Sequence, residues 1–152
     1  MKREVRDVAA SIHARLLALA NQRGEEFNRL LERFVFERFL FRLSISDLRE
    51  EMVVKGALLF VAWPGATDRT TRDLDFLSLG HSGQRDVADG IRRICETPVP
   101  HDDGVVFDPE SITTEEIRPK ASYGGIRVKL LARLGKARIP TQIDLGFGDV
   151  VV

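Results

Sequence analysis

The chain has 152 residues, of which 43% are hydrophobic and 30% charged, a composition that is typical of a folded globular domain and excludes a disordered one. Lys plus Arg and Asp plus Glu both number 23, so only local basic patches, and no global positive field, are available for binding nucleic acid. Cys95 is the single cysteine, which excludes an intramolecular disulfide, and no signal-like or membrane-length apolar run is visible. We therefore expect a soluble, cytoplasmic protein.

Two helices are predicted at the start of the chain. Apolar residues of 4–22 share one helical stripe, and Gly24 provides a stop. The segment 25–43 is apolar around most of its surface, because Phe36 and Phe41 add to its main stripe. A helix of this kind should be buried by several neighbours.

The middle of the chain alternates between strand and helix patterns. Extended segments are predicted at 52–55 and 72–79, and helices at 56–63 and 82–96. Turn-rich connections separate them at 44–50, 64–68 and 98–104, and the group His101 to Gly104 is interpreted as a turn although its residue types also occur as metal ligands. Two short strands are predicted at 105–107 and 111–117.

A β-hairpin is the clearest β-signal. Segments 125–134 and 137–145 flank a Gly135-Lys136 turn. The alternation predicts that one row of side chains points inward: Ile126, Val128, Leu130, Ala132, Leu134, Ile139, Thr141, Ile143 and Leu145. The chain as a whole predicts an α+β fold, with N-terminal helices over 1–45 and an α/β core over 46–152 that form a single domain around a small mixed sheet.

Three acids form the most informative pattern. Asp73 and Asp75 are two residues apart on a predicted strand and should share one face, where their charges repel unless a cation lies between them. Asp144 lies between Ile143 and Leu145, so it should face away from the core and join the pair if the strands are neighbours. Carboxylates suit Mg²⁺ or Mn²⁺, and three acids can hold two metals for in-line displacement at a phosphate.

A phosphate-binding element is predicted just before this pair. Gly56 opens a predicted helix, which lets backbone N–H groups approach a phosphate at the positive helix end. Arg69 and Arg72 are candidates to contact a triphosphate, although either could pair with a nearby acid such as Asp68. Lys55 could take part as well, or only extend its stem along the end of a strand.

The segments KGALLF, RTTRDLDFL and IDLGFGD, preceded by ERFLFRLS, resemble the AbiEii-type toxin family, which includes the MenT-type toxins, within the polymerase β-like nucleotidyltransferase superfamily. The resemblance implies the N-terminal core of a metal-dependent bacterial enzyme that transfers a nucleotide from a nucleoside triphosphate. It implies tRNA as acceptor in the MenT-type branch, and a cognate antitoxin. In the family pattern Asp73 and Asp75 fall on the metal-binding pair, Asp144 on the third acid, Gly56 on the phosphate-contacting glycine and Lys55 on the basic residue before it.

The sequence departs from the family pattern in two ways. Ala57 occupies the second signature position, which removes a hydroxyl contact while backbone contacts remain. Family members usually continue into a helical C-terminal half, so this chain is expected to be a core fragment whose exposed apolar surface favours self-association. Two alternatives follow: a non-catalytic binding module with the same fold, and a nucleotidyltransferase that modifies a protein hydroxyl.

The hairpin also carries an outward basic row. Arg127, Lys129 and Arg133 could lie along an RNA backbone, which proteins read mainly through charge and shape. The alternative is a solvated strand face whose charges prevent edge pairing. Similarly, the acid pair could be a solvated strand edge, and Asp144 could simply pair with an arginine.

Overall fold

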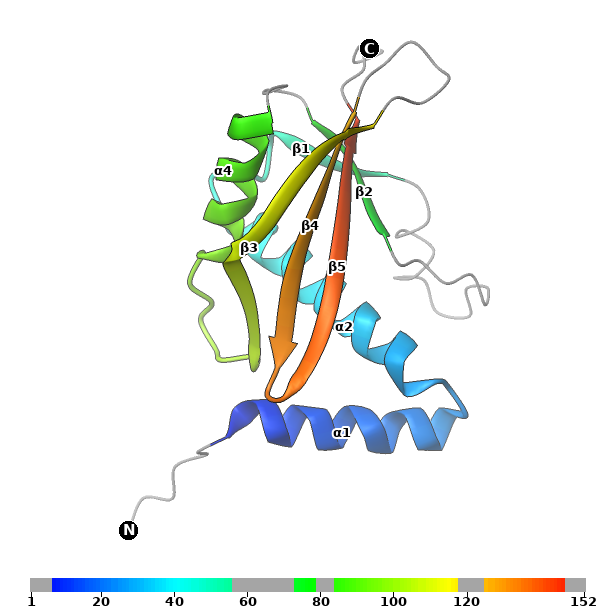
Figure 1. Ribbon diagram of the computed structural model, residues 1–152. Coiled ribbons are helices and arrows are strands. Elements are labelled where there is room, and N and C mark those ends of the chain that lie inside the picture. Colours follow the sequence, from blue (N-terminus) through cyan, green and yellow to red (C-terminus); the bar gives the residue numbers. More distant parts are fainter. Residues whose placement is uncertain (1–6, 56–72, 79–83, 118–124, 147–152) are drawn as a thin grey trace.

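A computed structural model describes residues 7–55, 73–78, 84–117 and 125–146 (Figure 1). Within these ranges no helix is long and apolar enough to cross a membrane. The helices and strands follow in the order α1 (Val8–Arg23), α2 (Phe27–Ser44), β1 (Met52–Lys55), β2 (Asp73–Ser78), α4 (Gln84–Cys95), β3 (Val105–Ile117), β4 (Gly125–Leu134) and β5 (Ala137–Gly146). The helix predicted at 56–63 and the loop predicted at 64–68 lie outside the described residues.

The two N-terminal helices are confirmed. α1 begins where the Asp7 carboxylate accepts a hydrogen bond of 2.8 Å from the Ala10 amide, and it ends at Gly24, whose φ of 65° is the left-handed cap conformation. α1 lies across the end of the sheet, beside the turn between β4 and β5 (Figure 1). α2 buries a broad surface that includes Phe36, as its all-round apolar sequence predicts.

The strands form one mixed sheet in the order β1-β2-β5-β4-β3. β2 runs parallel to β5, and every other neighbouring pair is antiparallel. The two short strands predicted at 105–107 and 111–117 are wrong in one respect, because they are halves of a single strand, β3, whose register shifts between Asp108 and Thr113. The Ser111 hydroxyl bridges this irregularity: it donates to the Asp108 carbonyl at 2.7 Å and accepts from the Leu131 amide at 2.8 Å.

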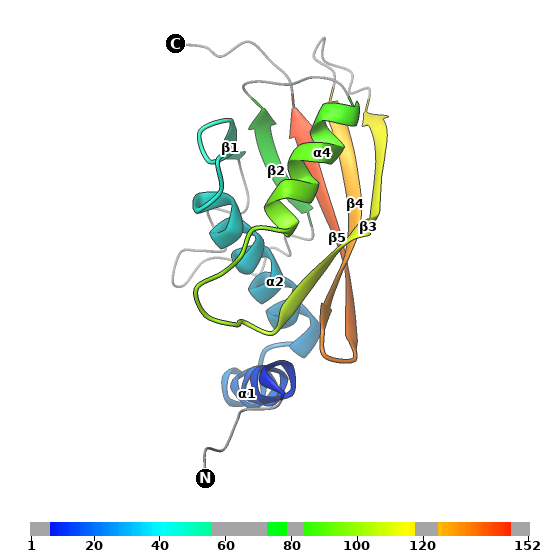
Figure 2. The same ribbon diagram turned by 90° about the vertical axis from the view of Figure 1, so that its left-hand side faces the viewer.

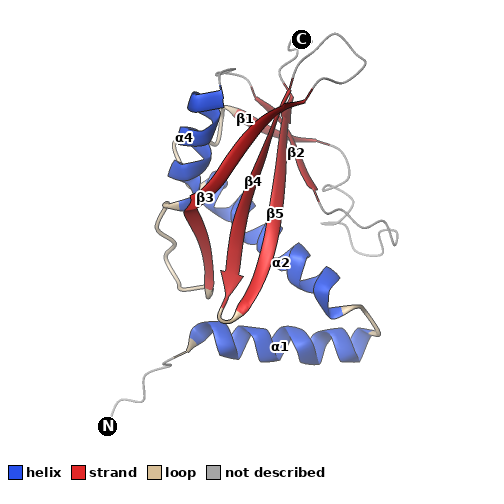
Figure 3. Cartoon of the chain, in the orientation of Figure 1, coloured by secondary structure: helices blue, strands red, loops and turns tan. Residues whose placement is uncertain are grey.

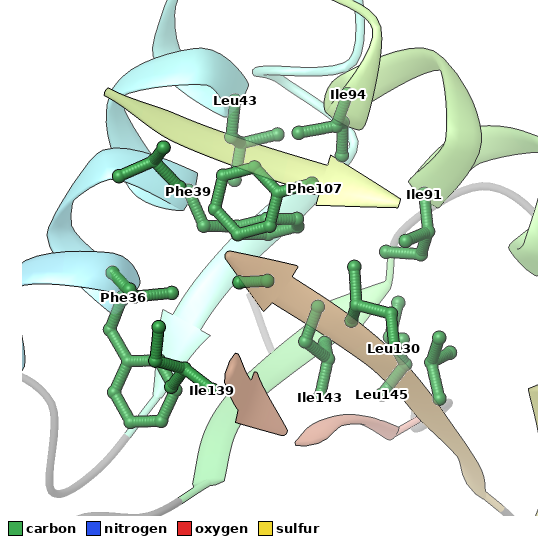
Figure 4. Packing of buried hydrophobic residues seen from close by; sticks show 14 of the residues in the cluster. Phe36, Phe39, Leu43, Ile91, Ile94, Phe107, Leu130, Ile139, Ile143 and Leu145 are labelled. Atoms are coloured by element: carbon green, nitrogen blue, oxygen red, sulfur yellow. The ribbon is translucent and has the colours of Figure 1, made fainter. Parts of the chain in front are cut away.

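The hydrophobic core lies on one face of the sheet, beneath α2 and α4 (Figure 2). All nine hairpin positions predicted to point inward are buried. Phe39 of α2 is fully buried and meets Phe107 of β3 edge-to-face, with 5.7 Å between ring centroids, while Ile91 and Ile94 of α4 close the other side (Figure 4). The strands alternate, so their remaining residues lie on the opposite face, which no helix of the described ranges covers.

A buried ion pair fastens α2 to the loop before β3. Arg42 donates to both carboxylate oxygens of Asp103, at 2.8 and 3.0 Å, and Arg38 donates to the same carboxylate at 2.7 Å. Arg42 also donates to the Val105 carbonyl at 3.2 Å. The segment 101–104 is a connection, as predicted, but the sequence did not reveal that its third residue is the anchor for two arginines.

Candidate functional site

Strand register brings acids of β2 and β5 to neighbouring positions. β2 and β5 are neighbours in the sheet (Figure 3). Asp75 lies opposite Asp144 in this parallel pair, and Asp73 lies opposite Gln142. Neighbouring strands are about 4.8 Å apart, and positions two residues apart on a strand share a face. The predicted grouping of the three acids required β2 and β5 to be neighbours, and they are.

Asp144 is held by an arginine of the next strand. Ile143 and Leu145 on either side of it are buried, which places Asp144 on the uncovered face of the sheet, as predicted. Arg127 of β4 lies opposite Asp144 and donates to it twice, from Nε to Oδ1 at 3.0 Å and from a terminal nitrogen to Oδ2 at 3.2 Å. Such a fork fixes both the position and the plane of a carboxylate.

The two acids stand between two basic residues. β1 pairs with β2 so that Lys55 lies opposite Asp75. Across β1, β2, β5 and β4 the register therefore reads Lys55, Asp75, Asp144 and Arg127, and we call these four residues the acid row. These four residues carry two negative and two positive formal charges, and Glu115 of β3, which lies opposite Arg127, adds one more negative charge at the same register.

Four of the five predicted phosphate-binding residues are not placed by the structure. Gly56, Ala57, Arg69 and Arg72 lie outside the described residues, so their roles stay predictions. Lys55, Asp73 and Asp75 are placed by strand register alone.

The donor chemistry of the three acids fits a divalent metal. Carboxylate oxygens are the ligands that Mg²⁺ and Mn²⁺ prefer, and Asp144 has 20% of its side chain exposed, so it is open to an ion. Among the described side chains, which include that of Asp144 but not those of its two predicted partners, no cluster of three metal-ligand types occurs. Asp73, Asp75 and Asp144 would together hold the ion.

The outward basic row is confirmed in its orientation. Lys129 and Arg133 are exposed on the same face as Arg127. Lys129 pairs with Glu115 of β3 at 3.4 Å, and both side chains are more than half exposed. Arg133 lies directly opposite Arg138, which places two like charges next to each other at the hairpin end of the face.

A separate groove of about 340 Å³ lies between the start of α2 and the start of β5. Its walls carry charges of both signs: Glu26, Asn28, Arg29, Leu31, Glu32, Arg138, Ile139 and Pro140. None of the predicted site residues lines this groove, so we assign the candidate site to the acid row.

Arg127 and Asp144 are partners, which the sequence did not reveal. Asp144 could pair with an unspecified arginine, and Arg127 was a candidate either for RNA contact or for a solvated strand face. The hairpin itself contains the signal for this pair. Its two-residue turn pairs Leu134 with Ala137, and counting seven residues away from the turn along each strand pairs Arg127 with Asp144.

A mixed sheet with helices on one face, and with an Asp-x-Asp strand beside a strand that carries a third acid, has the organisation of an α+β nucleotidyltransferase core. The family comparison agrees. The family model described as "Nucleotidyl transferase AbiEii toxin, Type IV TA system" matches residues 38–152, and the chain belongs to this family. The match begins within α2 and contains the whole acid row.

Two solved structures show weaker likeness. JHP933 from Helicobacter pylori is 17% identical with a TM-score of 0.46, and the alignment covers 82% of this chain and 46% of that one. A candidate nucleotidyltransferase from H. pylori is 15% identical with a TM-score of 0.43, and the alignment covers 78% and 44%. The chain thus spans less than half the length of either protein. No curated protein matches it.

Proposed function

We propose that this chain carries the catalytic centre of a nucleotidyltransferase toxin that transfers a nucleoside monophosphate from a nucleoside triphosphate to the 3′ end of an RNA, with tRNA as the first candidate. The observation that carries the proposal is the register of Asp75 opposite Asp144, with Asp73 two positions earlier, inside the region that the family model matches. Acids from two strands then share one face that no described helix covers.

The three acids define the chemistry. Asp73, Asp75 and Asp144 would hold Mg²⁺, which when bound neutralises the phosphates and favours ionisation of an attacking hydroxyl. Gly56 and Ala57 would present backbone amides to the phosphates, and Arg69 and Arg72 would add positive charge there. Lys55, opposite Asp75 in strand register, would supply a cation next to the acids.

The RNA assignment is supported by charge on the uncovered face. Arg133 and Arg138 lie directly opposite each other, and the repulsion between their like charges would fall if an anion bound both. Arg133 is six residues along β4 from Arg127, or roughly 20 Å at the rise of a strand. An RNA whose end lies at the acid row could therefore place a backbone phosphate at the hairpin end. Lys129 lies between, paired with Glu115.

Family membership also supports a protein partner. Because the family is that of a type IV toxin–antitoxin system, we propose that a cognate antitoxin exists for the protein that contains this chain.

The experiment is transfer of label from each α-labelled nucleoside triphosphate, with Mg²⁺ or Mn²⁺, into total tRNA, other RNA and a protein fraction. Asp75→Asn and Asp144→Asn should abolish transfer, whereas Asp89→Asn, an exposed acid of α4, should not change it. Label in RNA that both site variants lose supports the proposal. Label in the protein fraction would replace RNA by a protein acceptor, and no label from the wild-type protein would favour the non-catalytic alternative.

A further inference from the structure

The contact between Arg127 and Asp144 is a bidentate, partly buried ion pair. Both oxygens of the carboxylate are engaged, at 3.0 and 3.2 Å, by two nitrogens of one planar guanidinium. The two side chains are only 35% and 20% exposed, in contrast to the Lys129–Glu115 pair of the same face, which is 58% and 55% exposed. The fork therefore orders an acid that belongs to the candidate site.

The position of Arg127 is also informative. It approaches Asp144 from β4, whereas Asp75 lies at the same register position on β2, on the other side of β5. Asp144 thus lies between a cation and the position of another acid. A carboxylate offers about four lone-pair sites, and the fork uses two of them, so an ion on the β2 side would share Asp144 with Arg127.

We propose that Arg127 is the counter-cation of the acid row. With no divalent metal bound, it holds Asp144 and compensates the negative charge that accumulates where β2 and β5 meet. Once a metal shares Asp144, the same guanidinium is a positive charge close to that ion and opposes it. Arg127 is therefore a positioning residue that sets the metal concentration at which the site fills, an inference that rests on the proposed function.

The test compares Mn²⁺ affinity, measured by calorimetry, and the rise in Tm that saturating Mn²⁺ produces. Arg127→Met should lower the Tm of the metal-free protein because the acids lose their compensation. It should also tighten Mn²⁺ binding, on the order of threefold to fivefold, the scale that partly exposed ion pairs reach. The Mn²⁺-induced rise in Tm should be larger than in the wild type.

Two further variants separate the causes. Arg127→Lys keeps the charge and loses the fork, so its Mn²⁺ affinity should stay within twofold of the wild type (about 0.4 kcal/mol). Arg92→Met removes an arginine from an exposed pair with Asp89 on α4 and should change neither quantity. If Arg127→Met binds Mn²⁺ with unchanged or weaker affinity, the counter-cation role is wrong.

Failure of the proposed function has a different signature. In that case the wild-type protein would show no saturable Mn²⁺ binding, and Asp144→Asn would behave like the wild type. Saturable binding that Asp144→Asn removes, with no difference between the wild type and Arg127→Met, would overturn only the role of Arg127.

Discussion

The buried pair between α2 and the loop before β3 gives the sharpest stability prediction. Arg42 is 5% exposed and Asp103 is 8% exposed, and the guanidinium also lies 5.0 Å from the centroid of the Phe107 ring. Asp103→Asn keeps the shape of the side chain and removes its charge. Arg42 then stays buried as an uncompensated cation, because α2 fixes it under β3.

The expected loss is large for one substitution. Breaking a buried ion pair from one side costs roughly 3–5 kcal/mol, and Arg38, which also donates to Asp103, loses a partner as well. For a domain of this size, 1 kcal/mol corresponds to about 2–4 °C, so Tm should fall by roughly 6–20 °C. Urea denaturation gives the free energy of unfolding directly. Asp89→Asn, which breaks an exposed pair with Arg92, is the matched control and should cost less than about 1 kcal/mol.

The same pair predicts a pH dependence. Burial by itself would raise the pKa of Asp103, but hydrogen bonds from Arg42, Arg38 and the Val105 amide together hold the pKa below its usual 3.8. Because the pKa is lower in the folded than in the unfolded chain, the stabilisation is present above the unfolded pKa and is lost as pH falls through the folded one. The wild type should therefore approach Asp103→Asn in stability at acidic pH. Two results would refute this account. One is that Asp103→Asn costs no more stability at neutral pH than Asp89→Asn, and the other is that the stability difference between the wild type and Asp103→Asn stays constant down to pH 2.

Two further predictions test the packing. Gly104→Ala should destabilise the protein by about 2–3 kcal/mol in urea denaturation, because φ is +77° and the added Cβ would lie 2.9 Å from the Ala9 backbone. Gly24→Ala, with φ of +65° and open space around it, should cost only about 1 kcal/mol. Equal costs would mean that α1 moves away freely from Gly104. Burial raises the pKa of Cys95 to about 12, so its thiol should react with a disulfide reagent at pH 8 at least tenfold more slowly in the native than in the urea-unfolded protein, and equal rates would contradict its burial.

Asp144 combines two roles that the sequence presented as alternatives. The sequence offered two roles for this residue, a metal ligand or the partner of an arginine. The structure shows the arginine pair, and strand register shows that the same residue lies next to Asp75. The two roles are compatible, because the fork uses two of the about four lone-pair sites of the carboxylate and leaves the others for the proposed metal.

Local patterns in the sequence determined the three described helices, the hairpin and the face that each hairpin residue occupies. They suffice because helical and strand periodicity report burial directly, and because the Gly135-Lys136 turn fixes the hairpin register and hence the pairing of Arg127 with Asp144. The resemblance of motifs pointed to the family to which the chain belongs.

Only the tertiary structure decided what depends on contacts between distant segments. The placement of β2 beside β5, which brings Asp75 to Asp144, joins residues far apart in the chain, and no local periodicity encodes which strands become neighbours. The same holds for Arg42 and Asp103: each looks like a surface charge in its own segment, and only the packing of α2 on β3 buries them together. Sequence periodicity sets the face of each residue, whereas long-range packing sets its partner.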